Sequence, residues 1–482
     1  MKDKSSIIFG NKIKKSIVKS ADKQKKKYLK KFGDDSNVEY FFKTEENKIL
    51  IPFINLDDLK LSENYSKPLP EKSVIIGNIR MGYGHYRISI AIASCANSMG
   101  YKPLWLDLNS FENTTTSKII GHLNKLYSLG SRLSQKYKIF NKLYWEPLNS
   151  EGFRKIEYNA KDQKMTEIMS GLHKNLPKNI PYIATHVWPA QAAVHAGFNK
   201  VVNVIPDNWQ MALHLAEGSI HATQGFSAFL GYRTLRGMNK NNVLNPIPKK
   251  DIELTGHYID HELVANLEED TAKRLDRITN EKPLRILITV GGAGAQQEIV
   301  LEMINFLEPY IKSKKAAILL NIGDHKSFWE YLKTKKPDLE STSNLFFNDW
   351  QKTVDFAEKA LNEDIIGINI IQNGDIFEAI YTTNLLMRSA DIMITKPSEL
   401  AFYPVPKLLI KRVGGHEAWG AIRSAEIGDG TVEANETNYA LQLLKLMIEE
   451  KDILTLMNNK ILENNKIGIY NGGYNVIKLA VE

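Results

Sequence analysis

The chain has 482 residues, of which 43% are hydrophobic and 24% are charged. This composition is ordinary for a globular protein and excludes a collagen-like, fibrous or largely disordered chain. Its one cysteine, Cys95, excludes an intramolecular disulfide and any Cys-based zinc or iron–sulfur site, and it suits a reducing cytoplasm. No apolar run approaches the roughly 20 residues that span a bilayer, and the first residues lack the apolar core of a signal peptide.

The net charge of +8 is concentrated at the start of the chain. Residues 1–31 hold 12 lysines and 2 aspartates, a balance of +10, so the other residues together sum to about −2. Such a leader suits an anionic surface, and the alternative is a solvated disordered tail. Because Ile13, Ile17 and Val18 add a weak apolar stripe, we expect an anionic membrane surface and no specific nucleic acid as its partner. The expected location is cytoplasmic and peripheral on the inner face of the membrane.

Residues 1–70 comprise this leader and an irregular extension, in which residues 49–54 are an edge-strand candidate because they contain Pro52. Buried apolar runs then alternate with helical segments. The strands expected in this first unit are 73–79, 103–108, 182–185 and 201–205, and the helices are 84–99, 113–140 and 152–174. This alternation is typical of a parallel sheet with helices on both faces.

The same pattern restarts after a charged helix expected at 261–278. The strands expected in this second unit are 284–290, 316–321, 365–371, 391–395 and 407–410, with helices at 295–308 and within 437–463. We therefore predict an α/β protein with two doubly wound Rossmann-like domains that face each other across a cleft. We place them at 71–258 and 259–455, and we expect a helical tail at 456–482 to pack back on the first domain.

A glycine-rich turn follows the first strand of each unit. One is Gly82-Tyr83-Gly84-His85, and the other is Gly291-Gly292-Ala293-Gly294. Glycine lets the backbone approach a ligand, and the helix that follows offers free N–H groups to a phosphate. Asp107 matches the acid of a dinucleotide fingerprint, but Arg87 stands where its third glycine belongs. Either turn could instead be an ordinary tight turn.

Two further segments carry candidate polar groups. Lys396-Pro397-Ser398-Glu399 follows an expected strand, so that Ser398 can cap a helix and Glu399 can accept hydrogen bonds from a ribose diol. Glu399 could equally be a favourable first-turn helix residue. His416 and Glu417, delivered by Gly414 and Gly415, could bind sugar hydroxyls or simply form a loop with a polar cap.

These sites together resemble the GT-B glycosyltransferases of the MurG and monogalactosyldiacylglycerol-synthase group, over roughly residues 73–450. The matching elements are both glycine turns, Pro206-Asp207-Asn208-Trp209, Thr255-Gly256, Glu399 followed by Val405-Pro406, and the segment from His416 to Ala421. The sequence departs from the group in its short loop at 396–398, in Asp260 where a basic residue is expected, and in His416 where a glutamine is expected.

The resemblance implies a GT-B hexosyltransferase that moves a sugar from a UDP-sugar to an acceptor hydroxyl, such as that of a membrane lipid, with inversion and without a metal or cofactor. It implies His85 as the catalytic base, with Asp207 as the second candidate. It implies nucleotide-sugar binding by Gly291, Gly292, Ala293, Gly294, Lys396, Ser398, Glu399, Gly415, His416 and Glu417, and acceptor-side roles for Gly82, Tyr83, Gly84 and Trp209.

Three other hypotheses remain open. A sugar-nucleotide epimerase of the same fold would use the same cleft without an acceptor. The short loop at 396–398 and Asp260 would suit an inactive binding or scaffold protein. An NAD-dependent enzyme would use Gly82, Gly84 and Asp107, but it leaves the second glycine turn without a role.

Overall fold

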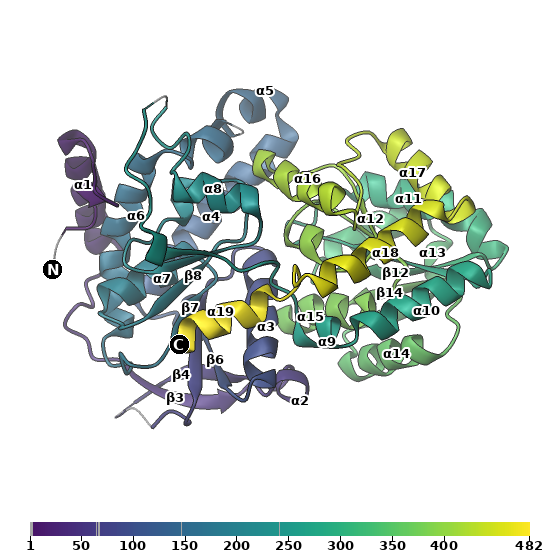
Figure 1. Ribbon diagram of the computed structural model, residues 1–482, viewed down its shortest axis with the longest axis horizontal. Coiled ribbons are helices and arrows are strands. Elements are labelled where there is room, and N and C mark those ends of the chain that lie inside the picture. Colours follow the sequence, from purple (N-terminus) through teal and green to yellow (C-terminus); the bar gives the residue numbers. More distant parts are fainter. Residues whose placement is uncertain (1–2, 64, 66–67, 146, 241) are drawn as a thin grey trace.

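The computed structural model describes residues 3–63, 65, 68–145, 147–240 and 242–482. It contains two large sheets of mainly parallel strands, which lie side by side (Figure 1). Among these residues the first sheet has the strand order β10-β9-β8-β7-β5-β6-β4-β3, and the second has the order β13-β14-β12-β11-β15-β16. Helices cover the faces of both sheets. The predicted α/β architecture of two Rossmann-like units is therefore confirmed.

The first sheet is parallel except for the antiparallel pair β3 and β4 at one edge. Its strands are β3 (Phe41–Glu46), β4 (Asp57–Ser62), β5 (Ser73–Asn78), β6 (Lys102–Asp107), β7 (Tyr182–Ala184), β8 (Val201–Val204), β9 (Ile220–Thr223) and β10 (Ile252–Leu254). Its helices include α3 (Gly84–Ser98), α4 (Thr115–Lys136), α5 (Lys138–Phe140), α6 (Ile156–Met169), α7 (Val187–His195) and α8 (Phe226–Arg233). Ile75 on the central β5 lies opposite Leu104 of β6 and Tyr182 of β7.

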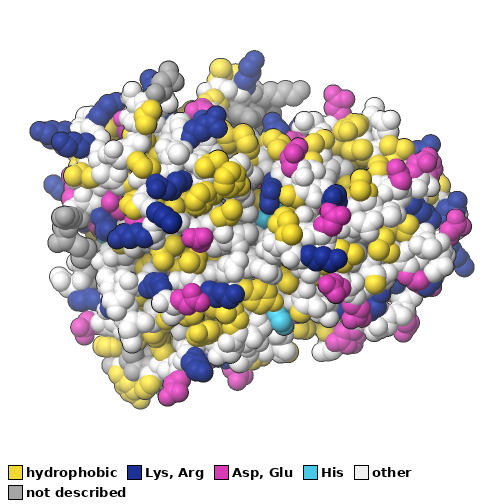
Figure 2. All heavy atoms as spheres, viewed as in Figure 1, with side chains coloured by type: hydrophobic (Ala, Val, Ile, Leu, Met, Phe, Trp, Pro, Cys, Tyr) yellow, Lys and Arg dark blue, Asp and Glu magenta, His cyan; other side chains and the backbone are white. Residues whose placement is uncertain are grey.

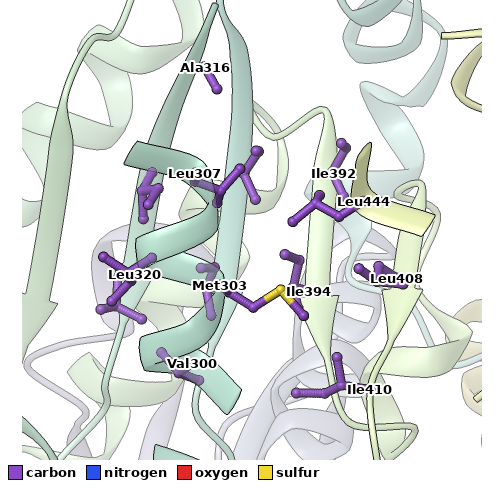
Figure 3. Close-up of a cluster of buried hydrophobic side chains, with 14 of the residues drawn as sticks. Val300, Met303, Leu307, Ala316, Leu320, Ile392, Ile394, Leu408, Ile410 and Leu444 are labelled. Carbon is purple, nitrogen blue, oxygen red and sulfur yellow. The ribbon is translucent and has the colours of Figure 1, made fainter. Parts of the chain in front are cut away.

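The second sheet is parallel throughout its described strands. These are β11 (Leu284–Thr289), β12 (Ala316–Asn321), β13 (Ser343–Phe347), β14 (Ile368–Gln372), β15 (Ile392–Thr395) and β16 (Lys407–Leu409). Its helices are α9 (His261–Ala265), α10 (Leu267–Thr279), α11 (Gln297–Lys312), α12 (Lys326–Lys335), α13 (Leu339–Thr342), α14 (Trp350–Asn362), α15 (Ile376–Met387), α16 (Ala418–Ile427), α17 (Thr437–Glu449) and α18 (Asp452–Lys466). Figure 3 shows the core on one face, where Met303 of α11 lies among Leu320, Ile394 and Leu408.

The prediction of an edge strand at residues 49–54 is wrong. The segment contains the one-turn helix α2 (Ile51–Ile54), which links β3 to β4. The side-chain oxygen of Asn47 accepts a hydrogen bond from the backbone N–H of Leu50 at 3.0 Å, and Pro52 lies within the first turn. Because proline is tolerated at the start of a helix, the apolar run is buried as a helical turn instead of a strand.

The alternative of a disordered tail at the N-terminus is wrong for its described residues; residues 1 and 2 lie outside them. A hairpin of β1 (Ile7–Ile8) and β2 (Asn11–Lys12) leads into α1 (Lys15–Phe32), which packs along α6. Ile13 is buried, and Ile17 and Val18 pack against the same core. The apolar stripe that we expected to contact lipid is therefore used inside the protein.

The last helix returns to the first sheet. After α18 the chain leads into α19 (Gly472–Val481), which lies against α3 (Figure 1). Val476 and Ile477 are buried in one cluster with Ile88 and Ile92 of α3. Within the described residues, no helix combines the length and the apolar character that crossing a membrane requires.

The carboxyl group of Asp162 on α6 generates a test of this packing, because burial raises its pKa to about 8. Between pH 4 and 8 the carboxyl group is deprotonated in the unfolded chain and protonated in the folded chain. This group therefore lowers the free energy of unfolding by up to about 1.4 kcal/mol for each unit that the pH rises. The stability of Asp162→Asn relative to the wild type should therefore rise with pH from about 4 and level off above about 8. Urea unfolding at several pH values measures this, with exposed Asp355→Asn as the control. A difference that does not change with pH would contradict a buried neutral acid.

Candidate functional site

The two glycine turns that the sequence singled out are in direct contact between the sheets. A Cβ atom built on Gly292 would lie 2.7 Å from the backbone nitrogen of Tyr83 and 2.8 Å from the Cα of Gly82. Real Cβ atoms essentially never approach that closely, so a glycine at position 292 is what allows this contact. Gly82 and Tyr83 follow β5 and Gly292 follows β11, so the carboxyl ends of the central strands of both sheets meet here.

A third turn, directly after β12, completes this contact. The Tyr83 hydroxyl donates to the carboxylate of Asp324, and the backbone N–H of Asp324 donates back to the Tyr83 oxygen at 3.0 Å. Arg80 forms an ion pair with Asp324 at 2.9 Å. His325 Nε2 donates to the carbonyl oxygen of Gly291 at 3.0 Å. Tyr83 therefore links the first domain to both turns of the second, through its backbone at Gly292 and through its side chain at Asp324.

Arg87 occupies the position at which a dinucleotide fingerprint would have its third glycine, and here it joins the two domains. Its side chain is 3% exposed. The guanidinium donates to Asn384 Oδ1 at 2.6 Å, to the carbonyl oxygen of Ile380 at 3.3 Å and to Glu399 Oε1 at 3.3 Å. Each of these acceptors belongs to the second domain. The other carboxylate oxygen of Glu399 lies 3.0 Å from a Cβ position built on Gly84, beside the N-terminus of α3.

A largely buried lysine–glutamate pair lies next to the second glycine turn. Lys396, directly after β15, forms an ion pair with Glu417, and its Cε lies 2.9 Å from a Cβ position built on Gly291. The other oxygen of Glu417 accepts hydrogen bonds from the backbone N–H groups of Val413 at 2.8 Å and Gly414 at 3.1 Å. Burial by itself would lower the pKa of Lys396, but the carboxylates of Glu417 and Glu399 outweigh it and raise that pKa. The lysine is therefore charged.

His85, at the start of α3, is held in one tautomer. Its Nδ1 lies 2.6 Å from the carbonyl oxygen of Thr185. A carbonyl oxygen only accepts hydrogen bonds, so Nδ1 carries the proton and Nε2 has a free lone pair. Burial lowers the pKa of His85, although Thr185, Asp207 and Glu399 oppose that shift. The imidazole is thus neutral at neutral pH, the form that can accept a proton.

Asp207 lies between two histidines from different domains. His214 Nε2 donates to Asp207 Oδ2 at 2.9 Å, and His416 Nε2 lies 3.9 Å from Oδ1. Burial alone would raise the pKa of Asp207, but His416 and His214 outweigh it and hold this pKa well below its usual range. Asp207 is therefore a carboxylate, and it also interacts electrostatically with His85.

Two tryptophans close one side of the same region. Trp209 and Trp419 stack with their ring centroids 4.7 Å apart and their planes 23° apart. Arg154 lies over Trp209 at 4.4 Å, and the Asn208 amide donates to the carbonyl oxygen of Trp419 at 3.3 Å. Because Trp209 belongs to the first domain and Trp419 to the second, this stack is a further contact between the domains.

The structure thus brings most of the predicted site residues into one interdomain cluster, comprising Gly82, Tyr83, Gly84, His85, Asp207, Trp209, Gly291, Gly292, Lys396, Glu399, His416 and Glu417. Gly294 lies beside His325, with its Cβ position 3.0 Å from Nδ1 of that ring. Ala293 is exposed, and Gly415 begins the short 3-10 helix η7 (Gly415–Glu417).

The predicted capping role of Ser398 is wrong. Its side chain makes no capping hydrogen bond, and residues Glu399–Phe402 form only the 3-10 helix η6. The second glycine turn also leads into its helix later than expected, because α11 begins at Gln297 after Gln296 in a left-handed conformation. Both differences reflect local backbone geometry that the residue types did not indicate.

Sequence reasoning missed several members of the cluster. They are Arg80, His214, Asp324 and His325, together with His186, whose ring lies 4.7 Å from that of His85, and Tyr127, which interacts electrostatically with Lys396 and Glu417. The segment from Asn321 to His325 was detectable, because it is a polar turn with a glycine directly after a buried strand, as in the two turns that were found. Arg87 was noticed only as a missing glycine. Asp107, the acid of the NAD hypothesis, accepts hydrogen bonds from the Tyr86 hydroxyl at 2.5 Å and from the backbone N–H of Asn109 at 2.9 Å. Its carboxylate therefore stabilises the turn that follows β6.

Two family models cover most of the chain. One, described as a domain of unknown function (DUF6937), matches residues 7–234, and the other, described as a domain of unknown function (DUF6938), matches residues 247–481. The division between them does not follow the sheets, because β10 lies in the second match and pairs with β9 of the first. No curated protein matches the chain.

Several solved structures are similar to the chain. A UDP-GlcNAc 2-epimerase from Neisseria meningitidis bound to UDP-GlcNAc is 12% identical with a TM-score of 0.44, over 84% of this chain and 98% of that one. A putative UDP-N-acetylglucosamine 2-epimerase from Listeria monocytogenes is 12% identical with a TM-score of 0.45, over 84% and 94%. An alpha,alpha-trehalose 6-phosphate synthase from Burkholderia multivorans is 10% identical with a TM-score of 0.42, over 86% and 98%. At these values the likeness assigns neither an activity nor a substrate.

The contact at Gly292 predicts the effect of adding one methyl group. In Gly292→Ala the new Cβ would meet backbone atoms of Gly82 and Tyr83, so the turns must separate or the backbone must shift. We expect this overpacking to destabilise the closed arrangement by roughly 1–3 kcal/mol. Urea unfolding and small-angle X-ray scattering measure the stability and the domain separation. Gly121→Ala on α4 is the matched control, because its Cβ would have nothing within 4 Å. If both variants behave alike, the turns are not in tight contact.

Proposed function

We propose that this protein is a glycosyltransferase that moves a sugar from a nucleotide-sugar donor to an acceptor hydroxyl. The observation that carries the proposal is a neutral histidine with a free Nε2, His85, in one cluster with a charged lysine, Lys396, and a glycine turn at Gly291–Gly294. Glycosyl transfer needs a base for the acceptor and compensating positive charge for the departing diphosphate. The motif resemblance favours a UDP-sugar as donor.

The second domain would hold the donor. Its diphosphate would lie against the backbone N–H groups of Gly291–Gly294, with the ammonium of Lys396 beside it. Glu399 would accept hydrogen bonds from the ribose through the oxygen that faces Gly84, while its other oxygen stays with Arg87. Because Tyr83 and Gly82 lie directly on Gly292, the domains must separate before a diphosphate can enter.

The first domain would activate the acceptor. His85 Nε2 takes the proton of the acceptor hydroxyl, whose oxygen forms a bond to the anomeric carbon of the sugar. The bond between that carbon and the diphosphate oxygen breaks, and the diphosphate leaves with the electron pair. Asp207 stabilises the imidazolium that forms on His85, since its negative charge already raises the pKa of this residue. With its own pKa held low, Asp207 is the weaker base candidate.

The donor and acceptor would approach from opposite domains, which suits a single displacement with inversion. In the proposed step Lys396 and the backbone N–H groups supply the positive charge, so the step is written without a metal or a cofactor. A hydroxyl-bearing membrane lipid is the acceptor class that we favour, and its approach is considered in the next subsection.

Removing the charge of Glu399 tests the donor site. Glu399→Gln should weaken UDP binding by roughly 1–3 kcal/mol, because it removes a charge-assisted hydrogen bond to the ribose. Isothermal titration calorimetry measures the affinity, and Glu253→Gln on the exposed part of β10 is the matched control. Unchanged UDP affinity in Glu399→Gln would remove this residue from the donor site, and the absence of UDP binding to the wild type would overturn the donor assignment.

Removing the imidazole of His85 tests the chemistry. His85→Ala should keep its affinity for UDP and lose transfer by roughly 10²- to 10⁴-fold, the usual contribution of a general base. In the wild type, transfer should fall on the acid side at a pH below the ordinary histidine value of about 6.5, because burial lowers the pKa of His85. The transfer rate of His85→Ala and the pH dependence of the wild type are measured by sugar release and by transfer to a hydroxyl acceptor.

The outcomes separate the candidates. If His85→Ala transfers within a few-fold of the wild type, the base lies elsewhere and Asp207 is tested next. If the wild type converts the sugar nucleotide to an epimer without any acceptor, the protein is an epimerase and the transferase proposal is wrong.

A further inference from the structure

The segment from the second half of α4 to the π-helical turn η1 (Asn141–Trp145) carries large apolar side chains that the protein does not cover. Their exposed fractions reach 75% for Ile139 and 73% for Leu143. The most exposed apolar side chains of this segment, which we call the apolar edge, are Leu126, Leu129, Tyr137, Ile139, Leu143 and Tyr144. Figure 1 places α5, at its centre, at the top of the view between α1 and α16. Large exposed apolar side chains gathered in one segment mark a site of interaction.

The apolar edge is set in a basic stretch of sequence. Residues 113–145 contain six lysines and arginines and not a single aspartate or glutamate. The side chains of Lys125 and Lys142 are exposed among the apolar residues. Hydrophobic and basic side chains lie next to each other at the top of the surface in Figure 2, where α5 is located.

A basic groove adjoins the apolar edge, where α1 packs beside α4. The groove has a volume of about 410 Å³ and is lined by Lys23, Gln24, Lys27, Tyr28 and Lys31 of α1 and by His122 and Leu126 of α4. Three of these lysines recur every four residues along one face of α1. Burial and the charges of Lys31, Lys27 and Lys125 lower the pKa of His122, so the groove has a positive potential. Leu126 belongs to both features, which makes them one continuous surface.

The same helix leads from this surface to the candidate site. Tyr127, next to Leu126, is 38% exposed. Partial burial and the charges of Glu417 and Asp207 raise its pKa, and the charge of Lys396 opposes this shift. Its ring packs on Trp145 at 5.2 Å between centroids. Beyond η1, the turn η2 (Leu148–Gly152) contacts η7, which carries His416. The apolar edge therefore lies at the mouth of the interdomain cluster.

We propose that the apolar edge and the lysine face of α1 together form a docking surface for an anionic lipid bilayer. The exposed aliphatic and aromatic side chains would enter the interfacial region, and the lysines would lie against acidic headgroups. This surface extends the proposed function, because a lipid acceptor held there could present its hydroxyl near Tyr127 while its chains stay in the bilayer.

The composition of the surface favours a bilayer over the other possible occupants. A nucleic acid is met mainly by polar and basic groups, and it offers no partner for Leu129, Ile139 and Leu143. A second copy of the chain, related by a two-fold axis, would bring the lysines of two copies together. An anionic leaflet satisfies both halves of the surface at once, since it offers negative headgroups above an apolar interior.

Vesicle co-sedimentation of the full chain tests this surface. The wild type should bind vesicles of phosphatidylserine and phosphatidylcholine at least tenfold more tightly than vesicles of phosphatidylcholine alone. Ile139→Asp/Leu143→Asp should weaken that binding at least tenfold, and Val243→Asp/Leu456→Asp is the matched control, because those apolar side chains are also exposed but lie elsewhere. Both residues of the first pair are more than 70% exposed, so their replacement leaves the core intact.

A second pair of variants tests the basic half. Lys23→Glu/Lys27→Glu should weaken binding about tenfold at 50 mM salt, and this difference should nearly disappear at 0.5 M salt because screening shortens the reach of the charges. Lys314→Glu/Lys315→Glu in the second domain is the control and should bind like the wild type.

Three results would overturn the proposal. They are equal binding to acidic and neutral vesicles, an effect of the lysine pair without any effect of Ile139→Asp/Leu143→Asp, and a wild-type dimer in sedimentation velocity that those aspartates dissociate. UDP binding in solution does not depend on this surface. Failure of vesicle binding with intact UDP binding would therefore reject the docking surface and leave the proposed function standing.

Discussion

The guanidinium of Arg87 is the group on which the interdomain site depends. A buried charge is costly unless it is paired and hydrogen-bonded, and every acceptor that the structure shows for Arg87 comes from α15 or η6 of the second domain. Because Arg87 lies in the first turn of α3, its anchorage also fixes Gly84 and His85, three and two residues before it. The position of the candidate base is thus coupled to the closure of the two domains.

Around this anchor, neighbouring charges give each titratable group a different state. His85 is kept neutral by burial, Asp207 is kept ionised by His214 and His416, and Lys396 is kept charged by Glu417. Burial alone would favour the neutral forms of Asp207 and Lys396, and their neighbours outweigh it, so one site holds a base, an anion and a cation at the same pH. The strand ends of two sheets, joined by contacts such as the Trp209–Trp419 stack, are needed to assemble this set.

The basic leader both packs against the first domain and presents lysines to solvent. Its apolar residues are used to attach α1 to α6, so that the helix is folded instead of free. The lysines that remain outside are thereby held on one side of a groove whose other side is α4. Attachment to the domain gives these charges a fixed position relative to the exposed residues of α4 and η1, which a disordered tail could not provide.

Local pattern was enough to predict the alternation of strands and helices, the two glycine turns and most residues of the cluster. A short apolar run indicates a buried strand, and a glycine directly after it indicates the end of that strand. Both signals lie within a few neighbouring residues. The same rule applied to Asn321–His325 would have added the third turn. The strands β9 (Ile220–Thr223) and β10 (Ile252–Leu254) were missed because polar residues interrupt their apolar runs.

What local pattern could not decide were interactions between residues far apart in the chain. Arg87 was interpreted as a missing glycine because its hydrogen-bond partners lie about 300 residues later in the chain. The apolar stripe of α1 was interpreted as a lipid-facing surface because the helix that covers it, α6, begins only at Ile156. The sequence by itself determined which elements form, since hydrophobic period and turn chemistry are local properties. Only the tertiary structure decided which charges are buried together, because desolvation and pairing depend on what packs around a group and not on its neighbours in sequence.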